Sequence, residues 1–256
     1  MTDEVVGVTA VFPLVVIAWT LLAIPVMIAS LIGIDPAGRA GGSGVGIRIN
    51  ARVAWFVAEL MALATFAAAY LGDGNPHLVG NVVFLLWTAH FGHRAFVWAW
   101  RGLPRGSTVP VTMGVAAMLF TGVHGALIGT SMADPTRYGP QWLADFPFVI
   151  GLTVMIGGAG LNVWSDYRLL ALRRRDPGRP VMPTGGPFNV VACPNHLGEI
   201  IEWVGFAILT WSLPALALAV WTVANLVPRA LWRRDWYQRT FADYPTWRAA
   251  LVPGLL

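Results

Sequence analysis

The sequence lacks lysine altogether, contains one cysteine and carries few charges of either sign. The single cysteine, Cys193, excludes an internal disulfide framework. Charged residues make up 12% of the chain, whereas a soluble domain averages about a quarter. With 56% apolar residues and a mean hydropathy of +0.62, the 256-residue chain would expose large apolar patches in water, so it requires lipid. Arginine as the sole positively charged residue is typical of a GC-rich genome and favours a bacterial source.

The motifs of common soluble enzyme classes are also missing. The histidines do not form the H-E-x-x-H spacing and there is no cysteine cluster, so no metal site is expected. No G-x-S-x-G elbow appears. The glycines of residues 41–46 miss the G-x-G-x-x-G register and follow no predicted strand, which excludes a Rossmann site. Nothing in the sequence indicates a nucleic-acid partner.

Long apolar runs take the place of these motifs. A membrane-spanning helix needs about 20 apolar residues, and five runs approach or reach this length: residues 8–32, 54–71, 78–100, 109–132 and 146–162. A last run, residues 197–231, would form a helix of roughly 50 Å, well beyond a bilayer core of roughly 30 Å. Pro214 offers a break, because proline cannot continue a helix without losing a hydrogen bond. The sequence therefore predicts an all-α membrane protein of one domain, residues 1–256, with seven transmembrane helices.

The arginines orient these helices. With seven spans, one side of the membrane holds the N-terminus and the connections near Asp73, Arg137 and Pro214, and of the 17 arginines only Arg137 lies there. The positive-inside rule makes the opposite side cytoplasmic, so the N-terminus is expected outside and the C-terminus inside. The acidic start and the lack of an A-x-A-like cleavage site indicate a first span rather than a removed signal peptide. We expect a multi-pass protein of a bacterial inner membrane, or of the endoplasmic reticulum if the source is eukaryotic.

Polar side chains inside these spans are the first functional candidates, because a charge in lipid is costly. Glu59 lies within the second span, one turn after Trp55 on the same face, and no arginine lies within a helical turn of it. Asn162 and Asp166 are four residues apart at the cytoplasmic end of the fifth span, so they share a helix face. Further candidates are His90, His93, His124, Glu199 and Glu202.

Structural roles compete with functional ones at several positions. Glu202, near the start of the sixth span, is expected to complement the helix dipole, and His124 to be a hydrogen-bonded packing residue. The run of residues 173–175, all arginine, could be only a topology determinant or a contact to lipid headgroups. Two long cytoplasmic stretches, residues 33–50 and 166–195, favour a functional role because long ordered loops tend to carry function.

Several segments together carry a family resemblance. The run N-H-L-G-E-I-I-E-W-V-G-F-A at residues 195–207, continued by T-W-S-L-P-A at 210–215, resembles the hallmark of the steroid 5α-reductase family. Shorter matches are residues 54–56, 59–60, 90–94, 161–167, 183–186 and 241–245. The resemblance covers roughly residues 50–256 and is densest over the last hundred.

The resemblance implies a seven-helix membrane fold that reduces the C4–C5 double bond of 3-oxo-Δ4 steroids with NADPH. It places the steroid in the half formed by residues 1–132 and the cofactor in the half formed by residues 133–256. Arginine suits the 2′-phosphate of NADPH because its planar fork of donors matches phosphate oxygens. The matching cofactor-binding positions are Trp55, which lies near the nicotinamide in the family, and Asn162, Asp166, Arg173, Arg179, Asn195, Glu199, Arg233 and Tyr237.

The resemblance also implies the catalytic chemistry. Hydride moves to the β-carbon of the enone, and buried Glu59, if protonated, donates to the ketone oxygen where negative charge develops. Two positions depart from the family pattern: Ala58 replaces a glutamine, and Phe91, in H-F-G-H-R at residues 90–94, replaces a tyrosine. The tyrosine hydroxyl that assists the glutamate is thus missing. Either another group such as His90 substitutes for it, or the substrate is a different lipophilic enone.

Two other functions remain open from the sequence. One is a membrane methyltransferase of the isoprenylcysteine or phospholipid type, which uses S-adenosylmethionine and has a similar C-terminal layout. The other is a non-enzymatic transporter or lipid-binding protein, for which related helical halves would be expected; none is visible in the sequence. In each case we expect a monomer in contact with membrane lipid, with a steroid-like small molecule as the partner of the reductase.

Overall fold

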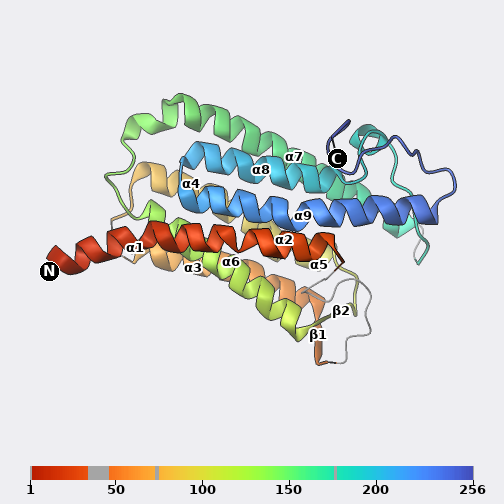
Figure 1. Cartoon of the computed structure of the whole chain (residues 1–256), viewed down its shortest axis with the longest axis horizontal. Helices are drawn as coiled ribbons and strands as arrows, with labels where there is room; N and C mark the ends of the chain where they lie inside the picture. The colour runs from red at the N-terminus through yellow and green to blue at the C-terminus, as the bar shows by residue number, and fades with distance from the viewer. Residues whose placement is uncertain (1, 34–45, 73–74, 176–177, 256) are drawn as a thin grey trace.

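The computed structural model describes residues 2–33, 46–72, 75–175 and 178–255, so most of the glycine-rich stretch at residues 41–46 lies outside the described residues (Figure 1). The described chain is mostly helical. Its elements are α1 (Thr2–Leu21), α2 (Ala23–Leu31), α3 (Ala51–Leu71), α4 (Leu78–Gly92), the π-helix η1 (His93–Trp98), α5 (Ala99–Arg101), α6 (Val111–Met132), the 3₁₀ turn η2 (Pro140–Ala144), α7 (Phe146–Arg175), the 3₁₀ turn η3 (Gly186–Asn189), α8 (Pro194–Thr210) and α9 (Leu213–Thr240).

One feature departs from the all-helical expectation. A short strand β1 (Arg48–Asn50) pairs antiparallel with β2 (Thr108–Pro110), directly before α3 and α6. The side chain of Asn50 then caps α3, accepting from the backbone N–H groups of Arg52 and Val53 at 2.9 and 3.3 Å. The small sheet thus joins the starts of α3 and α6, two helices that pack along each other.

Five stretches are long and apolar enough to cross a membrane: Val11–Leu31, Ala51–Leu71, Val111–Met132, Phe146–Arg175 and Leu213–Thr240. They correspond to the first, second, fourth, fifth and last predicted spans. The predicted third span is divided among α4, η1 and α5, which follow one another without a break from Leu78 to Arg101. The predicted sixth span is α8, of 17 residues. The chain is therefore a helical protein with several candidate membrane spans, and the number of crossings stays a prediction.

The break predicted near Pro214 is confirmed. Helix α8 ends at Thr210, and Trp211 has a left-handed backbone with φ of 45°. Helix α9 then starts at Leu213, with the Ser212 side chain accepting from the N–H of Ala215. Pro214 falls in the first turn of α9, where a helix has no partner for its N–H groups, so the proline costs no hydrogen bond.

Helices α7 and α8 lie side by side with their backbones in close contact (Figure 1). Gly151 and Gly158 on α7 face Gly205 and Gly198 on α8, and an added methyl group at any of these four positions would meet backbone of the opposite helix. Small residues at such positions let two helices in a membrane approach closely. This contact fixes the register between the last turns of α7 and the first turns of α8.

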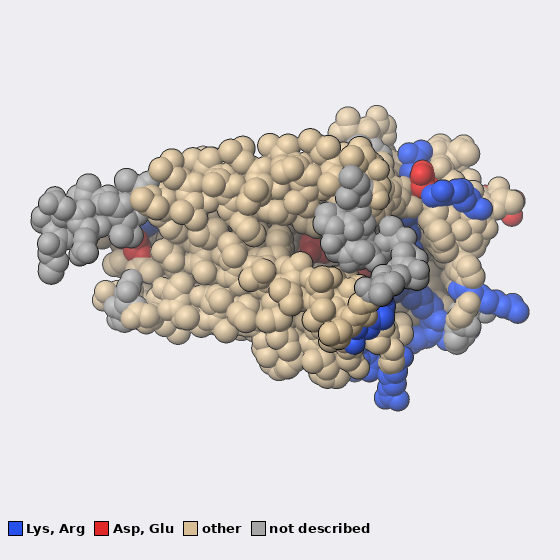
Figure 2. All heavy atoms as spheres, turned by 60° about the horizontal axis from the view of Figure 1, so that its bottom comes forward, with Lys and Arg blue, Asp and Glu red and all other residues tan. Residues whose placement is uncertain are grey.

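The molecule is an elongated helical bundle, and its arginines gather at one end. Figure 2 shows the blue side chains concentrated at the end that carries the C-terminus, while the long middle of the visible face is nearly free of charge. At the opposite end, Arg137 donates to the carbonyl of Trp211 in the α8–α9 turn at 3.1 Å. The structure thus separates Arg137 from the clustered arginines, as the sequence predicts.

Candidate active site

Within the described residues, a large and partly open cavity of about 620 Å³ is lined from α1, α2, α3, α4, η1 and α6 through α9. Its polar wall comes from the last turns of α7 and the first turns of α8, through Asp166, Arg173, Asn195 and Glu199. Its apolar wall comes largely from α6, with Met113, Ala116, Ala117, Leu119 and Phe120. A molecule with a charged part and an apolar part would suit this division, and so would a charged molecule bound beside an apolar one.

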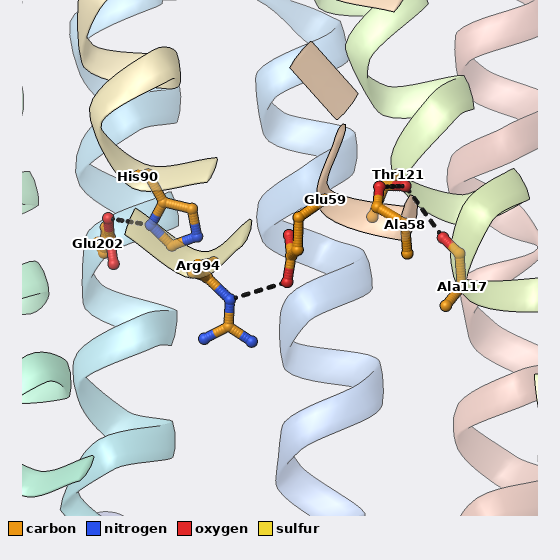
Figure 3. Close-up of polar contacts among 7 residues, drawn as sticks. All are labelled: Ala58, Glu59, His90, Arg94, Ala117, Thr121 and Glu202. Carbon is orange, nitrogen blue, oxygen red and sulfur yellow. Dashed lines mark hydrogen bonds and ion pairs between the residues drawn. The ribbon is translucent and has the colours of Figure 1, made fainter. Parts of the chain in front are cut away.

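An ion pair lies on the wall of this cavity. Arg94 in η1 donates from Nε to an oxygen of Glu59 in α3 at 3.1 Å, and both side chains are largely buried (Figure 3). The guanidinium also lies over the ring of Trp55, with 5.9 Å to its centroid. π-Helical turns within α-helices often occur at functional sites because they displace side chains from the regular register. Here the π-turn carries Arg94.

This pairing corrects the expectation that Glu59 is isolated from arginine. The sequence argument considered only arginines on the same helix, whereas Arg94 reaches Glu59 from a different helix. In this contact Glu59 is the acceptor, because a guanidinium has only donor N–H groups. Arg94 also lines the cavity and has further N–H groups beside the Nε that Glu59 engages.

A second buried pair joins α4 to α8. The Nδ1 atom of His90 lies 2.6 Å from a carboxylate oxygen of Glu202, and the side chains are 8% and 3% exposed (Figure 3). The expectation that Glu202 complements a helix dipole is wrong, because α8 already begins at Pro194 and Glu202 lies about two turns into it. The helix dipole acts only within the first turn.

Three polar side chains form a chain at the polar wall. Asn162 donates from Nδ2 to the backbone carbonyl of Asn195 at 3.0 Å, and Asn195 donates from Nδ2 to Asp166 at 3.0 Å. Asn162 is 5% exposed and stands behind Asn195, bordering a smaller cavity between α4 and α7 instead of the large one. The predicted cluster of Asn162, Asp166 and Asn195 is thus a single network, although only the last two face the large cavity.

Most of the predicted site residues line this one cavity: Trp55, Glu59, His90, Phe91, Asp166, Arg173, Asn195 and Glu199. Four others do not. Asn162 borders the smaller cavity instead. Arg179 is exposed, Arg233 is exposed and lies over the ring of Trp236, and buried Tyr237 stacks on Tyr244 with 5.6 Å between ring centroids. Burial raises the pKa of the neighbouring Cys193 thiol to about 12, against the opposing effect of the Arg233 charge, so this cysteine is inert at neutral pH.

Phe91 offers the cavity no polar atom. It is 6% exposed and packs on Trp87, with 4.3 Å between ring centroids.

Sequence reasoning gave no site role to Arg94 and a structural one to Glu202. The signal for Arg94 was available, since an arginine stood inside the apolar run of residues 78–100. No comparable signal existed for Glu202, because its partner is more than a hundred positions away.

The polar wall fits a polar ligand such as a dinucleotide. Among the described residues, the indole N–H of Trp55 and Nδ1 of His196 are buried without a hydrogen-bond partner, and both residues line the cavity. Buried polar atoms of this kind are rare in folded proteins unless a ligand or water satisfies them. Together with the Arg173 cation and the Asn195 and Asp166 side chains, they supply donors and acceptors for such a ligand.

Comparison with known proteins gives consistent matches. The family model described as 3-oxo-5-alpha-steroid 4-dehydrogenase matches residues 107–256. The pig protein 3-oxo-5-alpha-steroid 4-dehydrogenase 2 is 39% identical over 214 residues, covering 81% of this chain and 82% of the relative. The human type 2 protein is 37% identical over 211 residues, with 80% and 81% covered. The bovine type 1 protein is 31% identical over 237 residues, with 90% and 91% covered.

Proposed function

Because this chain belongs to the 3-oxo-5-alpha-steroid 4-dehydrogenase family of oxidoreductases, we propose that it reduces the C4–C5 double bond of 3-oxo-Δ4 steroids, or of a related lipophilic enone, with NADPH. The observation that carries this proposal is that the large cavity has both a polar wall, from α7 and α8, and an apolar wall, from α6. An apolar enone can contact the apolar wall while a charged nucleotide contacts the polar wall, so the two ligands can bind next to each other.

The polar wall is assigned to the cofactor. NADPH, when bound, supplies the hydride. Asn195 and Asp166 present amide and carboxylate groups to its ribose and carboxamide, and Arg173 faces the cavity as a cation for a phosphate. Trp55, whose indole N–H has no partner among the described residues, lies on the opposite wall near Glu59 and is assigned to the nicotinamide end.

The Glu59–Arg94 pair is assigned to the ketone oxygen. Hydride addition to the β-carbon places negative charge on that oxygen, and donors fixed in advance stabilise it without reorganisation. Arg94 keeps its charge, and its Nε bond to Glu59 and its contact with Trp55 fix its direction. The other guanidinium N–H groups then act as the donors, and Glu59 holds the guanidinium in place.

The membrane arrangement follows from the arginines. We assign seven crossings, with the N-terminus outside and the arginine-rich end of Figure 2 in the cytoplasm. The polar wall is formed near that end, where NADPH is available. Residues 1–132 then form the substrate-side half of a single domain, residues 133–256 the cofactor-side half. One copy of the chain supplies both walls, which is consistent with a functional monomer.

Thermal stability with each nucleotide tests the cofactor. A ligand that binds only the folded state raises the midpoint of unfolding, by about 2.7 kcal/mol in stability at one hundred times its Kd. We expect NADPH to stabilise the detergent-solubilised protein and S-adenosylmethionine to leave the midpoint unchanged. Stabilisation by S-adenosylmethionine alone would replace the reductase with a methyltransferase, and stabilisation by neither would favour the non-enzymatic alternative.

A further inference from the structure

The reduction proposed above consumes one hydride and one proton, and the hydrogen-bonded pair of His90 and Glu202 is placed to supply the proton. Figure 3 shows the His90 ring between Glu202 on one side and the Glu59–Arg94 pair on the other. Its Nδ1 atom contacts Glu202, and the described residues give Nε2 no hydrogen-bond partner. A histidine held by a carboxylate at one nitrogen and free at the other is an arrangement suited to general acid catalysis.

The other ionisable groups on the cavity wall are less suited to give up a proton at the substrate. The guanidinium groups of Arg94, Arg173 and Arg229 keep their protons, because arginine is not deprotonated in proteins. Glu59 and Asp166 are each engaged as acceptors, by Arg94 and Asn195, and Asp166 lies at the polar wall assigned to the cofactor.

The remaining histidines are also less well placed. His124 is occupied at both ring nitrogens, since Trp19 donates to Nε2 at 3.2 Å and Nδ1 lies 2.9 Å from the Phe120 carbonyl. His196 and Glu199 belong to the first turns of α8, beside Asn195 at the polar wall assigned to the cofactor. His90 alone combines a free ring nitrogen with a position next to the Glu59–Arg94 pair.

We propose that His90 is the proton donor to the α-carbon of the reduced enone and that Glu202 positions it and stabilises its charged form. The inference rests on the reductase function proposed above. The β-carbon gains a hydride from NADPH, which is thereby oxidised, and the electron pair of the C–C double bond moves toward the ketone oxygen. The resulting enolate takes a proton at its α-carbon, as the Nε2–H bond of the His90 imidazolium breaks.

After this step His90 is a neutral imidazole that still donates from Nδ1 to the Glu202 carboxylate. His90 also borders the smaller cavity of about 240 Å³ between α4 and α7, which Glu202 lines as well. We assign the return of the proton to water that enters this smaller cavity while the large cavity is filled. Side chains of α4 and α8 also meet beside the pair, with 4.6 Å between the ring centroids of His90 and Trp203.

The test is the face of deuterium incorporation during turnover in D₂O, read from the early product by NMR. A fixed donor delivers deuterium to one face of C4 of the steroid, whereas water in its absence reaches both. We expect the wild type to give one C4 epimer and His90→Gln to give a mixture, with kcat lowered about 10²-fold, since general acid catalysis contributes about 10²–10⁴-fold. Stabilisation by NADPH should be retained in this variant, which shows that it is folded.

Two further variants separate proton donation from a structural role. Glu202→Gln keeps a hydrogen-bonding group but removes the charge, and it should lower kcat less than His90→Gln. The double variant should be no worse than His90→Gln, because Glu202 acts only through His90. His124→Gln, the same substitution at another histidine of the cavity wall, should leave the deuterium on a single face.

The outcomes distinguish the two proposals. Wild-type turnover with a single C4 epimer that persists in His90→Gln would overturn the role of His90 while leaving the reductase function in place. A loss of kcat in His90→Gln without a change in the epimer ratio would show a structural role and overturn it equally. Absence of wild-type reduction of every 3-oxo-Δ4 steroid and related lipophilic enone would overturn both.

Discussion

Glu59→Gln is expected to lower kcat for a 3-oxo-Δ4 steroid by about 10²–10³-fold, the size of effect seen when one donor to a developing oxyanion is lost. Glutamine is nearly isosteric, but it lacks the charge that holds the Arg94 guanidinium at 3.1 Å. The guanidinium is then free to turn away from the ketone. Steady-state kinetics on the purified variant measure the effect, and KM should change little because the enone itself is bound by the apolar wall.

Arg94→Gln provides the matching variant. If the two residues act as a unit, Arg94→Gln should lose a similar factor in kcat, and the double variant should lose no more than the worse single variant. Additive losses would show that Glu59 and Arg94 act separately. Turnover of Glu59→Gln at the wild-type rate, in a protein that NADPH still stabilises, would rule out a catalytic role for the pair.

Asn195→Ala is expected to weaken NADPH binding by about 10–100-fold, while the fold persists. The substitution removes a donor at the polar wall and leaves Asp166 without the hydrogen bond that it accepts at 3.0 Å. An unsatisfied buried polar group costs about 1–3 kcal/mol, and each 1.4 kcal/mol corresponds to about tenfold in Kd. Titration of the intrinsic tryptophan fluorescence with NADPH measures the change.

Asn81→Ala is the control for this experiment. Asn81 also bonds through its side chain, accepting from the hydroxyl of Tyr70 at 2.9 Å, but it lies at the start of α4, at the other end of the bundle. The control should lower the thermal midpoint without changing the Kd for NADPH. Equal Kd values for Asn195→Ala and the wild type would remove Asn195 from the cofactor site.

Helices and their breaks were largely predictable from the sequence, because they depend on neighbouring residues. The end of the sixth span near Pro214 is an example, since the proline, the serine cap and the apolar runs on either side all act locally. The fifth span was predicted to stop near residue 162, whereas α7 continues to Arg175. The last turns of α7 contain polar residues because they form the polar wall of the cavity. Hydropathy alone therefore does not predict that the helix continues there.

The pairs that define the site could not be predicted in this way. Glu59 and Arg94 are 35 positions apart, and His90 and Glu202 are 112 positions apart. Each pair depends on how η1 meets α3 or how α4 faces α8, and those arrangements depend on helix packing. Most of the site residues that the resemblance identified do line the cavity, because a motif carries the result of packing in a related fold. Four that it assigned to the cofactor do not: Asn162, Arg179, Arg233 and Tyr237.

The most direct measurement of the central claim is the transfer of label from the cofactor to the steroid. The purified protein is incubated in ordinary water with a 3-oxo-Δ4 steroid and NADPH that carries deuterium at both C4 positions of the nicotinamide. We predict a saturated 3-oxo steroid with one deuterium at C5, the β-carbon, and none at C4. A saturated product without deuterium at C5, or no saturated product with any 3-oxo-Δ4 steroid or related lipophilic enone, would contradict NADPH-dependent hydride transfer by this protein.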